Sequence, residues 1–326
     1  MQAIVSRNTE GPRGLRQLEV QSPTPGPEEI LVRVRATALN RADLLQTLGQ
    51  YPTPPGVPAD IPGLEYAGEV TAVGERVRRW RVGDNVMGLV AGGAWAETLV
   101  THEREAMAMP RGCSFADAAA IPEAFATAFD ALVSQAHLSV GSRVLIHAAS
   151  SGVGTAAIQL CQLYGAEAIG TGRSESKLAR ARQLGLPHSI WVTGHQFSAE
   201  VNRLTAGQGC SVALDLVGGT WFPETIESMA PQGTVMLVGL VAGSTAQIPL
   251  RSVLTKRLRI MGTVLRARPL EEKIALARSF ESTLLPAFEM GRLKPVVDSV
   301  LPISEIAAAL ERLATNDTFG KVVLTW

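Results

Sequence analysis

Cysteine is scarce in this chain, which contains only Cys113, Cys161 and Cys210 among its 326 residues. The three lie far apart and none forms a Cys-x-x-Cys pair, which excludes a disulfide framework and a sulfur-rich structural zinc site. Cys161 falls in the apolar run AAIQLCQLYG, where a cysteine usually behaves as a small buried hydrophobe. We therefore expect Cys161 to be a packing residue.

An excess of charge of either sign is also missing, because 30 Lys and Arg residues balance 30 Asp and Glu residues. A balanced surface gives no electrostatic attraction for nucleic acid or for an anionic membrane. Apolar residues make up 46% of the chain and charged residues 18%, which excludes intrinsic disorder. No segment approaches the roughly 18 uninterrupted apolar residues of a membrane helix. The first residues, MQAIVSRNTEGPRG, lack the pattern of a signal peptide, and we expect a cytoplasmic location.

The pattern of apolar residues divides the chain into two parts. Up to about residue 120, short alternating runs are separated by turn and Pro-rich segments, which predicts a β-rich, barrel-like domain. Near Ala116 the rhythm changes, and an Ala-rich helical stretch, ADAAAIPEAFATAFDALVSQA, begins. Helical stretches then alternate with short apolar strands, which predicts βαβ units, a parallel sheet and an α/β fold class. The segments after Arg268 resemble neither part, and could return to pack on the β-rich domain.

The most informative segment is VLIHAASSGVGTAAIQLCQLYG, in which a strand runs through small residues into an Ala-rich helix. This geometry presents backbone N–H groups and a positive helix end to a pyrophosphate. Gly152, Gly154 and Ala157 match the G-x-G-x-x-G/A pattern, and a second register runs from Ala149 through Ser151 to Gly154. A Gly-rich turn without a ligand is the competing interpretation. We predict dinucleotide binding, with cofactor contacts from Ala149, Ser151, Gly152, Val153 and Gly154.

The choice of cofactor depends on the end of the next strand, in EAIGTGRSESK. A site that prefers NAD usually carries an acidic residue there, which bonds the ribose 2′-OH. Here no acid appears before Glu175, and Arg173, Ser174 and Lys177 offer two cations and a hydroxyl to a 2′-phosphate. A solvated helix start is the alternative, although cations are poorly placed at that end of a helix. The sequence predicts NADPH as the cofactor.

A second informative segment is ATALNRADLLQTLGQYPTPPG. Asn40 and Asp43 have the spacing of an N-cap and its N3 partner, and from spacing alone this structural role is favoured. Asn40, Asp43 and Gln46 would also share one helix face, where they could hydrogen-bond a substrate oxygen. Tyr51, in the following loop, could line a pocket or simply pack. The hypothesis for the site is that Asn40 and Asp43 are catalytic and that Gln46 and Tyr51 bind substrate.

The chain resembles the zinc-free quinone oxidoreductases of the medium-chain dehydrogenase/reductase superfamily. The resemblance is carried in order by NRADLLQTLGQY, IPGLEYAGEVTAVG, WRVGDNVMGL, AASSGVGTAAIQL and FGKVVL. These motifs most resemble those of the branch known for a tumour-suppressor-inducible quinone oxidoreductase. The resemblance implies a GroES-like catalytic domain over residues 1–120 and 266–326 and a Rossmann domain over residues 121–265. It also implies substrate beside Asn40 and a homodimer in which edge strands such as RIMGTVL pair.

The residues also address the question of zinc. Zinc-dependent members of the superfamily carry Cys at the position of Asn40 and His at the position of Leu64, before Glu65, and a four-cysteine lobe that this chain lacks. The five histidines are scattered and none has a ligand spacing. We expect no metal, and we expect His147, at the end of a strand, to pack beside the cofactor.

Without a Lewis acid, an electron-poor quinone or enone is the substrate that needs least help from the protein. The expected mechanism is hydride transfer from NADPH, with Asn40 and backbone N–H groups stabilising the enolate and water supplying the proton. Two departures from the family pattern concern specificity. Trp191 and Val192 stand where many relatives have an Asn-Tyr pair that helps hold the 2′-phosphate, and a substrate-side Tyr near Gln46 is absent.

The sequence thus predicts an NADPH-dependent reductase that acts on a small-molecule quinone or α,β-unsaturated carbonyl compound. Reduction of enoyl thioesters is an alternative within the same superfamily. A non-catalytic protein that binds NADPH as a sensor is an alternative from another class, although the presence of Asn40 and Asp43 favours an enzyme.

Overall fold

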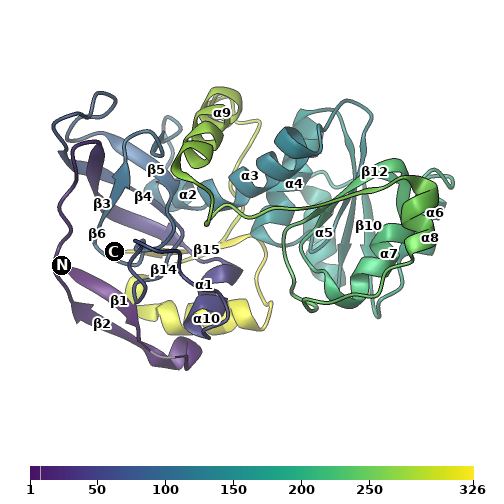
Figure 1. Cartoon of the computed structure of the whole chain (residues 1–326), viewed down its shortest axis with the longest axis horizontal. Helices are drawn as coiled ribbons and strands as arrows, with labels where there is room; N and C mark the ends of the chain where they lie inside the picture. The colour runs from purple at the N-terminus through teal and green to yellow at the C-terminus, as the bar shows by residue number, and fades with distance from the viewer. Residues whose placement is uncertain (8) are drawn as a thin grey trace. The chain divides into compact units, whose positions relative to one another are not determined.

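Alternating apolar residues in the first third of the chain form the strands of an antiparallel sheet, as seen in a computed structural model that describes residues 1–7 and 9–326. In β3 (Glu29–Ala38), Ile30, Val32 and Val34 face a core that also contains Tyr66 and Val86. The chain divides into two units, which are Met1–Ala126 with Leu265–Trp326 and Thr127–Val264. Each unit has its own sheet (Figure 1).

The first unit contains a seven-stranded sheet in the order β14-β15-β3-β4-β5-β7, with β6 paired to β3. The C-terminal strand β15 pairs antiparallel with β3, so the end of the chain joins the sheet formed by its beginning. The other strands of this unit are β4 (Glu65–Val73), β5 (Asn85–Leu89), β6 (Thr98–His102), β7 (Met107–Ala108), β14 (Val297–Pro302), β15 (Lys321–Thr325) and the separate pair β1 (Gln2–Ser6) and β2 (Leu15–Glu19).

The first unit has two short helices in its N-terminal part and two longer helices near the C-terminus. They are α1 (Arg41–Thr47), α2 (Phe115–Ala119), α9 (Leu270–Glu289) and α10 (Ile306–Ala314), with 3-10 turns at Gly11–Gly14 and Ile303–Glu305. The predicted Ala-rich helical stretch is not continuous. It is divided into α2, α3 (Pro122–Phe129) and a π-helical segment, Asp130–Gln135. The break between α2 and α3 falls just before Pro122, because proline disfavours helical conformation in the residue before it.

The second unit contains a six-stranded parallel sheet in the order β10-β9-β8-β11-β12-β13. Its strands are β8 (Arg143–Ile146), β9 (Glu167–Gly172), β10 (His188–Trp191), β11 (Cys210–Asp215), β12 (Met229–Leu237) and β13 (Arg259–Gly262). In chain order this is 3-2-1-4-5-6, the order of a dinucleotide-binding Rossmann sheet, whose connections reverse between β8 and β11. The predicted α/β fold class is confirmed.

Helices cover both faces of the parallel sheet (Figure 1). They are α4 (Gly152–Leu163), α5 (Glu175–Gln183), α6 (Ser198–Leu204), α7 (Phe222–Glu227) and α8 (Leu250–Lys256), with a 3-10 turn at Gly219–Trp221. Cys161 is buried in α4, as its apolar surroundings predicted. The strand predicted over residues 259–265 is shorter than expected, since β13 ends at Gly262.

Candidate functional site

The segment around Asn40 joins strand β3 to helix α1. Asn40 and Asp43 form a capping box, in which the Asn40 backbone N–H donates to Asp43 Oδ2 at 2.8 Å. The structural role predicted from their spacing is therefore present. The Asn40 amide has further partners, because its Nδ2 donates to Ala38 O at 3.2 Å and to Glu65 Oε1 at 3.0 Å. Both amide hydrogens are thus engaged within the protein, and neither is left to donate to a substrate oxygen.

A buried ion pair lies against Asn40. Lys321 Nζ is 2.7 Å from Glu65 Oε1, and the two side chains are 5% and 0% exposed. The ammonium group also donates to Leu39 O at 2.8 Å and to Asn40 Oδ1 at 2.5 Å, so its three donors are satisfied. These residues meet because β15 and β4 both pair with β3. The cation held by this group of oxygens is the protein's own ammonium.

Two further carboxyl groups have strongly shifted acidity. Burial raises the pKa of Asp43 to about 7, against smaller lowering effects from the Asn40 backbone and from Lys321. Burial and the nearby Glu65 carboxylate raise the pKa of Glu123 to about 8. A low-dielectric environment disfavours the charged form of a carboxyl group, and the neighbouring carboxylate adds to this effect. Both groups are therefore largely protonated around neutral pH or just below it.

Arg266 brings together the residues predicted to bind substrate. Its Nη2 donates to Gln46 Oε1 at 2.7 Å, and its guanidinium group lies 5.0 Å from the centre of the Tyr51 ring. Arg266 Nε donates to Ala91 O at 2.6 Å, which anchors the guanidinium. Burial raises the pKa of the Tyr51 phenol, so this group stays protonated. The loop after α1 is thus held by a cation–π contact and charge-assisted hydrogen bonds.

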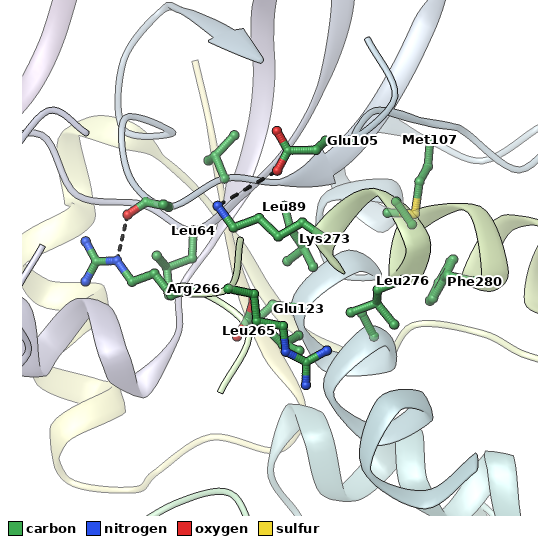
Figure 2. Close-up of a pocket in the computed structure, with 15 residues that line it drawn as sticks. Leu64, Leu89, Glu105, Met107, Glu123, Leu265, Arg266, Lys273, Leu276 and Phe280 are labelled. Carbon is green, nitrogen blue, oxygen red and sulfur yellow. Dashed lines mark hydrogen bonds and ion pairs between the residues drawn. The ribbon is translucent and has the colours of Figure 1, made fainter. Parts of the chain in front are cut away.

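A cavity opens in the first unit beside Arg266 (Figure 2). Its walls are largely apolar, with Leu276 and Phe280 of α9 on one side and Leu64 and Leu89 of the sheet. Five ionisable side chains also line it: Glu105, Glu123, Arg266, Arg268 and Lys273. Glu105 and Lys273 lie 3.9 Å apart. Mostly apolar cavities with a few placed polar groups are typical of small-molecule sites. Neither Asn40 nor Asp43 is part of the cavity wall.

In the second unit, the turn between β8 and α4 has the conformation expected of a phosphate-binding loop. Ser151 caps the 12-residue helix α4 by accepting a hydrogen bond from Gly154 N at 3.0 Å. A Cβ atom on Gly154 would lie 2.4 Å from Ala148 O, so only glycine fits there. Among the hydrogen bonds of residues 1–7 and 9–326, the N–H groups of Gly152 and Val153 donate to none. Two free N–H groups at a helix start fit an anionic pyrophosphate.

Ala149, unlike Gly152 and Val153 of the same loop, has a hydrogen-bonded backbone N–H. It is fully buried, and its N–H donates to Thr171 O at 3.0 Å. This N–H is therefore not available to a phosphate, and the residue joins the loop to strand β9.

The turn after β9 presents the residues predicted to distinguish NADPH from NADH. Arg173 is exposed, and Ser174 caps α5 by accepting a hydrogen bond from Lys177 N. Trp191, which is 54% exposed, donates through Nε1 to Arg173 O at 3.3 Å. Val192 is only 2% exposed and packs in the core, so its side chain is turned away from this surface. The aromatic ring beside the turn thus comes from Trp191.

His147, which was expected to pack beside the cofactor, makes all its described side-chain contacts with other residues of the protein core. The side chain is fully buried, with its two ring nitrogens 2.8 Å from Thr171 Oγ1 and 2.9 Å from Thr225 Oγ1. Phe197 and Trp221 pack against the ring edge-to-face. Burial lowers the pKa of His147, which is therefore a neutral core residue.

The residues present do not fit a zinc ion. Where zinc-dependent relatives carry Cys and His, this chain has an Asn whose oxygen contacts an ammonium group and an apolar Leu64. Within the part of the chain that the structure describes, no three His, Cys, Asp or Glu side chains are grouped so as to hold a metal ion. Among the described residues, no helix is long and apolar enough to cross a membrane.

Four residues of the site were not predicted to take part in it: Glu65, Glu123, Arg266 and Lys321. A signal was present for two of them. Glu123 is a charged residue inside the apolar run AAAIPEAFATAF, and Lys321 begins β15, directly before the apolar residues VVL. Charged residues are rarely buried unless they are paired, so their positions in apolar segments could have marked them.

The chain is similar to known proteins over nearly its whole length. Residues 26–111 match the alcohol dehydrogenase GroES-like domain and residues 152–281 match the family described as zinc-binding dehydrogenase. A quinone oxidoreductase-like protein 2 homolog from Nematostella vectensis is 32% identical over 302 residues, which covers 92% of this chain and 82% of that protein.

Solved structures give the same picture. A structure described as an NAD-dependent alcohol dehydrogenase is 33% identical, with a TM-score of 0.89 and full coverage of both chains. The JamJ enoyl reductase in its apo form is 27% identical, with a TM-score of 0.89, and the match covers 99% of this chain and 98% of that one.

Proposed function

Since the chain belongs to the zinc-free quinone oxidoreductase family of the medium-chain dehydrogenase/reductase superfamily, we propose that it is an NADPH-dependent reductase of quinones or α,β-unsaturated carbonyl compounds. The observation that carries the proposal is the Asn40–Lys321–Glu65 group, in which Asn40 has the position where, by the resemblance, zinc-dependent members carry a cysteine ligand. The charge of this ammonium is already neutralised by Glu65. A substrate that is electron-poor by itself needs no Lewis acid, since its π-system delocalises the charge that hydride brings.

The nicotinamide, when bound, supplies the hydride. In this proposal the free N–H groups of Gly152 and Val153 bind the pyrophosphate, together with the positive end of α4. Arg173, Ser174 and Lys177 receive the 2′-phosphate, which favours NADPH over NADH. Ala149 joins the loop to strand β9 rather than binding the cofactor.

The substrate occupies the cavity lined by Leu64, Glu123 and Arg266. Its apolar walls exclude water from the reacting carbon, and Arg266 fixes Gln46 and the Tyr51 ring at one side. Asn40 is a positioning residue in this proposal. It holds the Lys321–Glu65 pair, and Glu65 in turn accepts the backbone N–H of Glu123 at 2.8 Å. Asp43 closes the start of α1 and adds a like charge when it is ionised.

Reduction of an enoyl thioester is a second candidate, favoured by the similarity to the JamJ enoyl reductase. An acyl thioester has the same conjugated carbonyl group as an enone, and the cavity extends along α9 past Leu276 to Phe280. The expected small-molecule partner is therefore one of these electron-poor carbonyl compounds. The cytoplasmic location remains a prediction.

The test is the loss of NADPH absorbance with 1,2-naphthoquinone, a linear enone and an enoyl thioester. We expect turnover of the quinone and the enone, unaffected by chelators. Turnover of the thioester alone would favour the second candidate. Tight binding of NADPH without turnover of any substrate would contradict the proposal and indicate a nucleotide-binding protein without catalytic activity.

A further inference from the structure

The Glu123 carboxyl group lies in the cavity, and the proposed binding of substrate and cofactor gives it no role. Glu123 lies in the first turn of α3, and its side chain lines the cavity with Leu64 and Arg266 (Figure 2). Its backbone N–H donates to Glu65 Oε2 at 2.8 Å, which ties the start of α3 to the buried ion pair. This hydrogen bond fixes the backbone, so the carboxyl group is held on the cavity wall.

The Glu123 carboxyl group has no counter-ion in this site. Lys321 already donates to Leu39 O, Asn40 Oδ1 and Glu65 Oε1. Arg266 donates to Gln46 and to Ala91 O. Within residues 1–7 and 9–326, no hydrogen bond or ion pair of the Glu123 carboxyl oxygens is present. The other acid of the cavity, Glu105, differs because it is paired with Lys273.

Charges from several elements act on Glu123. Glu65 of β4 and Asp43 of α1 favour its protonated form, while Lys321 of β15 and Arg266 favour the ionised form. Tyr51 also lies within reach of its charge. Burial outweighs the two cations and, with Glu65, raises the pKa of Glu123 to about 8. A carboxyl group of this kind holds a proton at neutral pH and can still release it.

We propose that Glu123 is the proton donor of the reduction, an inference that rests on the reductase function proposed above. Hydride forms a C–H bond at the electron-poor carbon of the substrate, and the π electrons move to the carbonyl oxygen. The enolate then takes the proton of Glu123, whose O–H bond breaks to leave a carboxylate. Water returns a proton to this carboxylate before the next turnover. The substrate gains one hydride and one proton, and the nicotinamide is oxidised.

Substitution of Glu123 by Gln keeps the shape of the side chain and removes its acidic proton. General acid catalysis typically contributes about 10²–10⁴-fold, so kcat for a linear enone should fall about a hundredfold in Glu123→Gln. The effect on a quinone should be smaller, because the aromatic ring of the reduced product stabilises its oxyanion until water protonates it. NADPH binding, followed by its fluorescence, should be unchanged.

The control variant is Glu271→Gln, which removes an exposed carboxylate from the first turn of α9. Glu271 pairs with Arg104 on the surface, 2.6 Å away, and does not line the cavity. Its kcat should equal that of the wild type. Melting temperatures of both variants separate a loss of fold from a loss of the proton.

The wild-type protein provides two measurements that do not depend on a variant's folding. Its kcat for the enone should fall as pH rises above about 8. Infrared titration of the cofactor-free protein should show a protonated carboxyl group that ionises over the same range and is missing from Glu123→Gln.

The outcomes separate the two proposals. A wild-type protein that reduces the enone while Glu123→Gln reduces it equally fast, with no dependence on pH, overturns the role of Glu123 alone. If the wild type shows no infrared signal of a protonated carboxyl group at neutral pH, the role of Glu123 as proton donor is overturned as well. A wild-type protein that binds NADPH but reduces none of the substrates overturns the reductase function and the donor role together.

Discussion

Asn40 has two roles, because it caps helix α1 and also holds the buried Lys321–Glu65 ion pair. Its backbone N–H is bound by Asp43 within the capping box, while its amide bridges Lys321 and Glu65. A buried ion pair is stable only when its remaining donors and acceptors are satisfied. Asn40 and the Glu123 backbone supply these partners, so the side chain acts through the pair rather than by donating to substrate.

Asn40→Ser tests this role, because serine is a near-equal cap but lacks the amide. We expect kcat to fall about tenfold with a quinone and more with an enone, because Lys321 and Glu65 lose the amide that positions them. This is less than the roughly 10²–10³ typical for loss of a direct donor to the oxyanion, since the Asn40 amide does not reach the substrate. Asn40→Ala should in addition lower stability by about 1 kcal/mol through loss of the cap. The measurements are kcat and melting temperature. Wild-type turnover of both substrates by Asn40→Ser would show that Asn40 is only a cap.

Lys177 tests the choice of cofactor at the same scale. A charge-assisted hydrogen bond contributes about 1.5–3 kcal/mol, so Lys177→Ala should weaken NADPH binding about tenfold or more and leave NADH binding nearly unchanged. Arg182→Ala, near the other end of α5, is the control, because Arg182 is bonded to Ser189 at 2.6 Å. Titration of both cofactors measures the effect. An equal loss for NADPH and NADH would contradict the assignment of Lys177 to the 2′-phosphate.

At the scale of elements, local features were predictable and long-range ones were not. The β8–α4 turn could be predicted because Ser151, Gly152 and Gly154 are neighbours in sequence, and the N-cap of α1 for the same reason. The Lys321–Glu65 pair joins residues 256 positions apart, which meet only when β15 and β4 both pair with β3. No local pattern encodes that meeting. The break at Pro122 is likewise a local feature, because proline disfavours helical conformation in the residue before it.

Gly154→Ala should disrupt the start of α4. A Cβ atom would lie 2.4 Å from Ala148 O and 2.8 Å from Ala149 Cα, both backbone atoms that cannot move without shifting the loop. We expect weaker binding of NADPH and NADH alike, since the free N–H groups of Gly152 and Val153 would move, and a lower melting temperature. Gly194→Ala is the matched control, because nothing lies within 4 Å of the corresponding Cβ. Equal behaviour of the two variants would contradict the close-approach argument.

At the scale of the whole molecule, the two units carry buried titratable groups whose pKa values are shifted in opposite directions. The folded-state pKa of Asp43 is raised to about 7 from an ordinary value of 3.8, so the folded chain binds more protons between these limits. Stability conferred by this group is therefore present at low pH and lost as pH rises through about 7. Burial lowers the pKa of His147 from 6.5, so its contribution is lost as pH falls below that value.

Asp43→Asn should remove the first of these effects. As pH rises from about 4 to about 7, the free energy of unfolding of the wild type should decline relative to that of the variant. The reason is that Asp43 of the wild type releases a proton on unfolding in this range, whereas the Asn side chain of the variant does not. Chemical denaturation across this range measures the difference. Parallel curves for the two proteins would show that Asp43 titrates in the folded chain as it does when unfolded.

The assembly of the molecule is the last prediction, and it follows from the edge of the parallel sheet. Among the described strands, β13 pairs with β12 alone. Ile260 on this strand is 40% exposed, and Val264, just beyond it, is 56% exposed. On α8, which lies between β12 and β13 in the chain, Leu250 and Leu254 are 71% and 76% exposed. An open apolar edge strand invites pairing with another chain, and a two-fold axis lets it pair with its own copy.

We therefore expect a homodimer with twice the chain mass of 34.6 kDa at micromolar concentration. Ile260→Lys should convert it to the single chain, because a two-fold axis would bring two ammonium groups together at the edge. Val82→Lys, at a 63% exposed apolar position in the first unit, should remain a dimer. Sedimentation velocity measures both. A wild-type protein that sediments as one chain would show that β13 is left unpaired, and an Ile260→Lys dimer would place the contact elsewhere.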